Sequence, residues 1–263
     1  MPELNVAGRT LHYTDTGSSG SPVLLLHAFP LNSQMWEPQI ESLGDRFRFI
    51  APDLTGFGES DAPDDGYSLG RWAEEIEALL DELGLDRVVL VGLSMGGYLA
   101  FECLRRSRER FSALVLADTK AEADPPEAIE KRTKQQAMVR EGGRDDLIAA
   151  LTGALLGEAT NEKKPDVVER VRTLMDNPSA GFIGALQAMK QRPDSSGELA
   201  AIDIPTLIIV GENDAVTPPD ASRKMHEHIG GSRLVVLPEA GHLSNLEAPE
   251  AFNGALAEFL GSL

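Results

Sequence analysis

The sequence is poor in cysteine and contains no long hydrophobic run. Cys103 is the only cysteine among 263 residues, so an internal disulfide is excluded. No apolar run approaches the roughly 18 residues that a membrane-spanning helix needs, and residues 1–5 show no basic and apolar leader. We therefore expect a cytoplasmic protein that has no membrane partner.

Basic residues are also scarce, since 24 Lys and Arg face 42 Asp and Glu and give a formal net charge of −18 at pH 7. Such a chain repels phosphate backbones and anionic membrane surfaces, so nucleic acid is not an expected partner. The acidic residues are scattered over predicted helix faces, which indicates a strongly solvated surface. The expected partner is a small molecule, and the sequence leaves a homo-oligomer open.

Strand and helix patterns alternate along most of the chain. Between residues 120 and 201 the strand signals vanish, and amphipathic helical stretches follow one another. The alternation predicts an α/β fold with a mostly parallel sheet covered on both faces. We assign residues 1–119 and 202–263 to this core and residues 120–201 to an inserted helical cap. Apolar strands are predicted at residues 22–26, 47–51, 88–91, 113–117, 206–210 and 233–237.

One of these strands runs into a tight turn, Gly92-Leu93-Ser94-Met95-Gly96, which is followed by a helical pattern. In such a corner, large side chains two places before and after the serine would collide. The serine hydroxyl is thereby exposed beside the amino terminus of a helix, whose free N–H groups favour negative charge. The pattern predicts that Ser94 is a nucleophile.

A serine hydroxyl needs a base, and the base needs an acid to orient it. His242 is the best placed of five histidines because it directly follows a buried strand, whereas His27 is expected to brace a loop. Asp118 and Asp214 both follow predicted strands. Asp214 is favoured as the acid, because its strand directly precedes the strand that leads to His242.

The substrate is encoded weakly. No isolated arginine marks a substrate carboxylate, which disfavours a dicarboxylate, although Arg132, Arg140 and Lys190 remain candidates. Several apolar residues are expected to line a pocket beneath the cap, and each is equally well explained by core packing. They are Trp36, Met138, Phe182, Met189, Val216 and Leu243.

The chain order of Ser94, Asp214 and His242, together with the serine turn, resembles the α/β-hydrolase superfamily. Residues 27–30, 53–60 and 211–214 are similar to its oxyanion loop, its glycine-rich turn and its acid loop. The likeness covers nearly the whole chain. In finer detail, the chain resembles bacterial carboxylesterases and 3-oxoadipate enol-lactonases.

This resemblance implies an eight-stranded, mostly parallel sheet flanked by helices and a helical cap. It also implies an oxyanion hole made by the backbone N–H groups of Phe29 and Met95, with no metal and no cofactor. One departure is Ala28, which occupies a place where the family pattern usually has glycine. A side chain there restricts the backbone of the loop.

The activity implied is hydrolysis of carboxylic esters of small apolar substrates through an acyl-enzyme on Ser94. A lactonase or a cofactor-free perhydrolase would use the same residues and stays open, and a non-catalytic ligand-binding protein on this fold is a more remote alternative. A dehalogenase or an epoxide hydrolase is disfavoured, because those relatives have a carboxylate at the position of Ser94.

Overall fold

The computed structural model describes residues 2–6 and 8–263, and in this part of the chain eight strands form one sheet. Their order is β1-β2-β4-β3-β5-β6-β7-β8. Strand β2 (Arg9–Asp15) is antiparallel to both of its neighbours, β1 (Glu3–Val6) and β4 (Arg48–Pro52). All other neighbours are parallel, which confirms the predicted sheet. The remaining strands are β3 (Pro22–Leu26), β5 (Val88–Leu93), β6 (Phe111–Ala117), β7 (Thr206–Gly211) and β8 (Arg233–Leu237).

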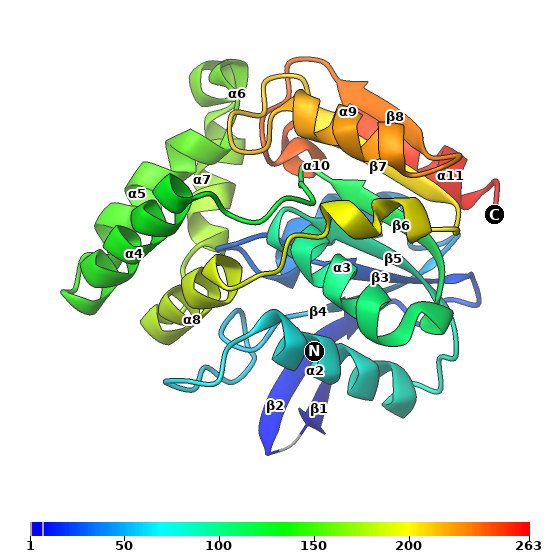
Figure 1. Cartoon of the computed structure of the whole chain (residues 1–263), viewed down its shortest axis with the longest axis horizontal. Coiled ribbons are helices and arrows are strands. Elements are labelled where there is room, and N and C mark those ends of the chain that lie inside the picture. The colour runs from blue at the N-terminus through cyan, green and yellow to red at the C-terminus, as the bar shows by residue number, and fades with distance from the viewer. Residues whose placement is uncertain (1, 7) are drawn as a thin grey trace.

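Helices cover both faces of the sheet (Figure 1), so its central strands are apolar throughout. All six residues of β5 are buried. Figure 1 shows α2 (Leu69–Glu82) and α3 (Met95–Ser107) in front of the sheet and α11 (Pro249–Leu260) behind it. The other helices of the core are α1 (Glu37–Leu43), α9 (Pro219–His228) and the short α10 (Ser244–Glu247).

The register of the parallel strands brings their carboxyl ends to one edge. Leu26 of β3 pairs with Gly92 of β5, and Gly92 pairs with Leu116 of β6. The loops after these strands therefore meet in one region, which is where ligands bind to open α/β sheets.

The segment between β6 and β7, called the cap below, forms five α-helices and a short 3-10 helix (Ser196–Ala201) beside this edge of the sheet (Figure 1). Helical patterns at residues 127–141, 146–156, 165–175 and 178–191 predict four of them, and the short α6 is missed. None of the described helices is both long and apolar enough to cross a membrane. The five are α4 (Pro126–Arg140), α5 (Arg144–Leu155), α6 (Glu158–Lys163), α7 (Pro165–Leu174) and α8 (Ser179–Lys190).

The pair Asn177-Pro178 predicts an N-cap at Asn177 and a helix that begins at Pro178, and this prediction is wrong by one residue. Pro178 is extended, with ψ 144°, and the helix begins at Ser179. The Asn177 side chain makes no capping hydrogen bond to this helix and contacts the core instead. Its Oδ1 accepts a hydrogen bond from the Gly58 N–H at 2.7 Å, and its Nδ2 donates to the Pro30 carbonyl at 2.8 Å. Asn177 therefore ties the cap to the loop after β3.

Candidate active site

Ser94 occupies a strained corner between β5 and α3, with φ 54° and ψ −112°. Such a conformation costs a residue other than glycine roughly 1–3 kcal/mol, so neighbouring contacts must hold it in place. The Ser94 N–H donates to the Ala117 carbonyl at 3.0 Å, and the Thr119 hydroxyl donates to the Ser94 carbonyl at 2.8 Å.

The glycines of this corner are sterically required. A Cβ on Gly92 would lie 2.3 Å from the Gly96 carbonyl oxygen, and a Cβ on Gly96 would lie 2.1 Å from the Leu26 carbonyl oxygen. Both obstacles are backbone atoms, which cannot rotate away. The close packing of β5, α3 and β3 therefore depends on glycine at both positions.

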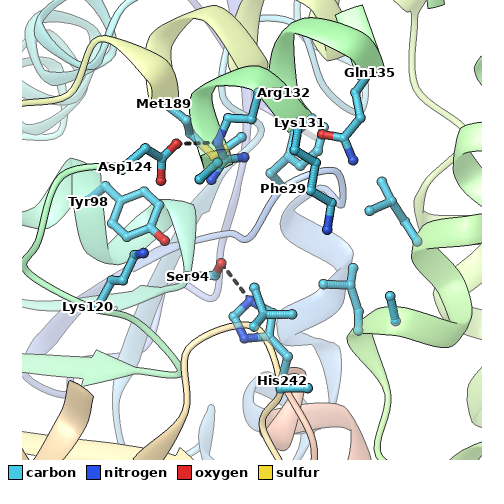
Figure 2. Close-up of a pocket in the computed structure, with 16 residues that line it drawn as sticks. Phe29, Ser94, Tyr98, Lys120, Asp124, Lys131, Arg132, Gln135, Met189 and His242 are labelled. Carbon is cyan, nitrogen blue, oxygen red and sulfur yellow. Dashed lines mark hydrogen bonds and ion pairs between the residues drawn. The ribbon is translucent and has the colours of Figure 1, made fainter. Parts of the chain in front are cut away.

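Ser94, His242 and Asp214 form a continuous chain of hydrogen bonds. His242 Nε2 lies 2.7 Å from Ser94 Oγ (Figure 2), and His242 Nδ1 lies 2.8 Å from Asp214 Oδ2. Because a carboxylate only accepts, Nδ1 carries the proton and Nε2 accepts from the serine hydroxyl. The histidine is thus oriented to take the proton of Ser94.

The loop after β7 is folded around Asp214. Its Oδ1 accepts from the N–H groups of Val216 and Thr217 at 2.8 and 2.9 Å, and its Oδ2 accepts from the Thr217 hydroxyl at 2.7 Å. Burial opposes ionisation of this carboxyl, but the neighbouring imidazole of His242 and the hydrogen bonds outweigh burial and lower the pKa of Asp214. The carboxylate is therefore held in its ionised form.

Asp118, the alternative acid, faces other partners. Its Oδ1 accepts from the Gly211 N–H at 2.8 Å, and its Oδ2 accepts from the Ser244 hydroxyl at 2.5 Å. Complete burial and the nearby charge of Asp214 raise the pKa of Asp118 well above its usual value. Asp118 joins β6 to β7 and α10, whereas Asp214 is the carboxylate on His242.

The two residues expected to form the oxyanion hole lie beside Ser94. Met95 is the first residue of α3, where N–H groups have no acceptor in a preceding turn. Phe29 lines the cavity that Ser94 opens into. Ala28 is accommodated in the loop after β3, since it is buried and its N–H contacts the Met35 sulfur at 3.2 Å.

His27 lies below this loop rather than beside Ser94. Its Nδ1 donates to the Ala28 carbonyl at 3.0 Å, and its Nε2 accepts from the Leu54 N–H at 3.1 Å. Burial lowers the pKa of His27, which agrees with a neutral ring that donates at one nitrogen and accepts at the other. His27 therefore braces the loop that carries Phe29.

A cavity of about 400 Å³ lies between Ser94 and the cap. Two of the predicted pocket residues, Met189 and Val216, line it. The prediction for Trp36, Phe182 and Leu243 is corrected, because these three side chains are fully buried in the core. Met138 is 43% exposed and does not line the cavity either. Apolar residue type alone does not distinguish a core position from a pocket position.

Apart from Ser94, His242 and Arg132, the polar residues of the lining are absent from the sequence prediction. Figure 2 shows these side chains around Ser94. A signal for part of the set exists in the sequence: residues 128, 131, 132 and 135 have the i, i+3, i+4, i+7 spacing of one helix face, and all four line the cavity from α4. The polar and charged lining comprises Tyr98, Lys120, Asp124, Lys131, Arg132 and Gln135.

One carboxylate in this lining is shared by two arginines. Asp124 Oδ2 lies 2.5 Å from Arg132 Nε, and Asp124 Oδ1 lies 2.8 Å from Arg192 Nη1. Burial opposes the charge of Asp124, but the two guanidinium groups outweigh it and lower the pKa of this carboxyl. Arg192 also stacks on the Tyr98 ring, 4.0 Å from its centroid. The negative charge of Asp124 is therefore neutralised by arginines of the protein itself.

The loop that carries His242 is fastened to the cap by Glu247. The buried Glu247 carboxylate accepts from Gly241 N–H at 3.0 Å and Leu243 N–H at 3.2 Å, on either side of His242, and from Gly157 N–H at 2.8 Å in the cap. The His242 N–H donates to the Leu155 carbonyl at 3.1 Å. We call this arrangement of Glu247 and the three N–H groups the Glu247 clasp.

Within residues 2–6 and 8–263, no three His, Cys, Asp or Glu side chains are grouped in a way that would hold a metal ion. His226 and His228, which the sequence places two apart on a helix, have separate partners. His226 contacts the Ser232 hydroxyl, and His228 contacts the Lys224 carbonyl.

Comparison with known proteins places this geometry in a family. The family model described as alpha/beta hydrolase fold matches residues 21–249. The AB hydrolase superfamily protein YisY of Bacillus subtilis is 34% identical and the 3-oxoadipate enol-lactonase 2 of Acinetobacter baylyi is 31% identical, over 96% and 94% of this chain and 96% and 91% of theirs. The structure of a thermophilic esterase from Thermogutta terrifontis, with malate bound, superposes with a TM-score of 0.95 at 39% identity and covers 100% of this chain and 99% of that one. The chain belongs to the alpha/beta hydrolase family, as its sequence motifs predict.

Proposed function

We propose that this protein is a serine hydrolase that cleaves carboxylic esters, with Ser94 as nucleophile, His242 as base and Asp214 as the acid that orients the base. The single observation that carries the proposal is the hydrogen-bond chain of 2.7 and 2.8 Å through these three side chains, which opens into a cavity of about 400 Å³. The similarity of this chain to an esterase and to an enol-lactonase supports the same class of reaction, the hydrolysis of an ester bond.

The reaction begins when His242 Nε2 takes the proton of Ser94 Oγ as this oxygen attacks the carbonyl carbon of the ester. The carbonyl oxygen becomes negatively charged and accepts hydrogen bonds from the N–H groups of Met95 and Phe29. The carbon–oxygen bond to the alcohol then breaks, and His242 gives its proton to the departing alcohol. The product of this half-reaction is an acyl-enzyme on Ser94.

Water completes the cycle by the same steps. His242 removes a proton from the water that attacks the acyl carbon, and then returns it to Ser94 Oγ as the carboxylic acid leaves. Asp214 stays ionised throughout, fixes the proton on Nδ1 and stabilises the imidazolium that forms in each half-reaction.

A lactone is the second candidate substrate, because an enol-lactonase covers most of this chain. In a lactone the departing alcohol remains attached to the acyl group, so the same residues open a ring. The two candidates differ only in the shape of the molecule that the cavity holds.

A p-nitrophenyl ester series, from acetate upwards, tests the proposal when it is offered to the wild type, to Ser94→Ala and to the matched surface variant Ser196→Ala. We expect Ser94→Ala to lower kcat by about 10⁴-fold or more and Ser196→Ala to retain it. A lactone series followed by pH-stat titration covers the second candidate. Equal hydrolysis by the wild type and by Ser94→Ala would contradict the proposal.

A further inference from the structure

The cavity in front of Ser94 is positively charged, although the chain as a whole carries a formal charge of −18. Its charged lining consists of Lys120, Lys131 and Arg132 against one carboxylate, Asp124. Arg132 and Asp124 neutralise each other, and Asp124 is also paired with Arg192. The two lysines therefore provide positive charge that the cavity itself does not balance.

Lys120 has the more enclosed of the two ammonium groups. It follows β6 by three residues and lines the cavity together with Tyr98 and Ser94. No hydrogen bond or ion pair joins it to any described residue, and burial together with the charge of Arg192 lowers its pKa. Lys120 is only half-buried, so its ammonium group keeps access to the space of the cavity and can donate to an acceptor that enters it.

Lys131 approaches the cavity from the cap. It lies on the face of α4 that also presents Arg132 and Gln135. In the described part of the chain it has no acidic partner either. In Figure 2 the side chains of Lys120 and Lys131 both extend towards the space around Ser94, from opposite sides of the view.

We infer that the substrate carries a carboxylate in addition to the ester or lactone that Ser94 attacks, and that Lys120, assisted by Lys131, binds this carboxylate. The inference rests on the proposed function and names its substrate class: half-esters of dicarboxylic acids, or lactones that bear a carboxylate. Charge-assisted hydrogen bonds to the two ammonium groups replace the water that the carboxylate loses on entry.

This inference revises the small apolar ester expected from the sequence. Leu151, Leu155 and Val216 give the cavity an apolar wall, which suits the methylene chain between the two ends of such a substrate. A wholly apolar ester would fill the same space but would leave both ammonium groups facing hydrocarbon. Only a substrate that has both a carboxylate and an apolar chain contacts the lysines and the apolar wall at the same time.

The test compares monoethyl adipate with ethyl hexanoate, which differ only in a carboxylate in place of the terminal methyl group. Acid release is followed by pH-stat titration. We expect kcat/KM of the wild type to favour the half-ester by about tenfold or more, as a charge-assisted contact provides. Lys120→Gln should reduce this preference by about tenfold, Lys131→Gln should reduce it less, and the control Lys134→Gln, a surface lysine of α4 paired with Glu130, should leave it unchanged.

Direct binding separates this inference from the proposed function. Adipate is titrated by calorimetry into Ser94→Ala and into the double variant Ser94→Ala, Lys120→Gln, and we expect about tenfold weaker binding in the double variant. Turnover of ethyl hexanoate that depends on Ser94, without a preference for the half-ester, would overturn the inference and leave the proposed function standing. Binding of adipate that depends on Lys120, without turnover of any ester, would support the inference and overturn the proposed function.

Discussion

Asp118 and Asp214 lie beyond the ends of the neighbouring strands β6 and β7, and only Asp214 contacts His242. Both carboxyls are buried, yet their pKa values shift in opposite directions. Asp214 faces an imidazole and three donors, whereas Asp118 is desolvated beside the charge of Asp214. Two aspartates that are similar in sequence context thus have different expected roles.

The first prediction concerns activity. Asp214→Asn should lower kcat by about 10⁴-fold, because an amide no longer fixes the proton on His242 Nδ1 or stabilises the imidazolium. Asp118→Asn should cause a much smaller loss, because Asp118 has no contact with the ring. Steady-state hydrolysis of one p-nitrophenyl ester by both variants measures the difference. A larger loss in Asp118→Asn would show that Asp118, and not Asp214, is the acid that orients His242.

The second prediction concerns the pH dependence of stability at Asp214. Its native pKa is lowered, so its contribution to the free energy of unfolding is fully present above the unfolded value of about 3.9 and is lost as the pH falls through the native value. The stability advantage of the wild type over Asp214→Asn should shrink as the pH falls below about 4. Urea unfolding between about pH 5 and pH 3 gives this difference, and an advantage that grows as the pH falls through this range would refute the assignment.

The third prediction is the opposite trend at Asp118. Its native pKa is raised, so the protonated carboxyl is favoured in the folded state, and its contribution is fully present below the unfolded value of about 3.9 and lost as the pH rises through the native value. The free energy of unfolding of the wild type relative to Asp118→Asn should therefore fall as the pH is raised above about 4. The same urea series measures it, and a flat difference would mean that Asp118 is not perturbed.

The fourth prediction concerns the contact between cap and core at Gly181. A Cβ there would lie 1.9 Å from the Gly56 carbonyl oxygen, whereas nothing lies within 4 Å of a Cβ at Gly153, inside α5. Gly181→Ala should lower the free energy of unfolding by about 1–3 kcal/mol. The control Gly153→Ala should raise it by up to about 1 kcal/mol. Thermal unfolding of both variants tests the pair, and equal effects would show that the cap does not approach the core this closely.

The fifth prediction concerns Glu247. Glu247→Gln replaces one acceptor oxygen by a donor that faces backbone N–H groups, so we expect a loss of about 1–3 kcal/mol in the free energy of unfolding. It should also reduce kcat, because Gly241 and Leu243 position His242. Glu250→Gln, an exposed glutamate of α11, is the matched control. A Glu247→Gln variant with wild-type kcat would show that the clasp does not position the base.

The fold was predictable because its signals are local. Each parallel strand is a short apolar run, and Ser94, Asp214 and His242 each follow such a run, so one shared sheet edge brings them together. Lys120 was not predictable as part of the cavity, because its position depends on how α4 and α8 lie over the sheet. Phe182 illustrates the same limit: it packs behind Phe29, 5.6 Å between ring centroids, rather than in the cavity.

The Glu247 clasp also has a consequence for local opening of the molecule. The amides of Gly157, Gly241 and Leu243 share one acceptor group, and the backbone of His242 is bonded to Leu155. Amides protected by one shared contact exchange with solvent in the same opening event. Hydrogen exchange at this corner of the cap and around the general base should therefore occur as one cooperative unit. Because His242 moves with this corner, we expect an opening there to separate the imidazole from Ser94, so that the open form lacks the base that the proposed reaction needs.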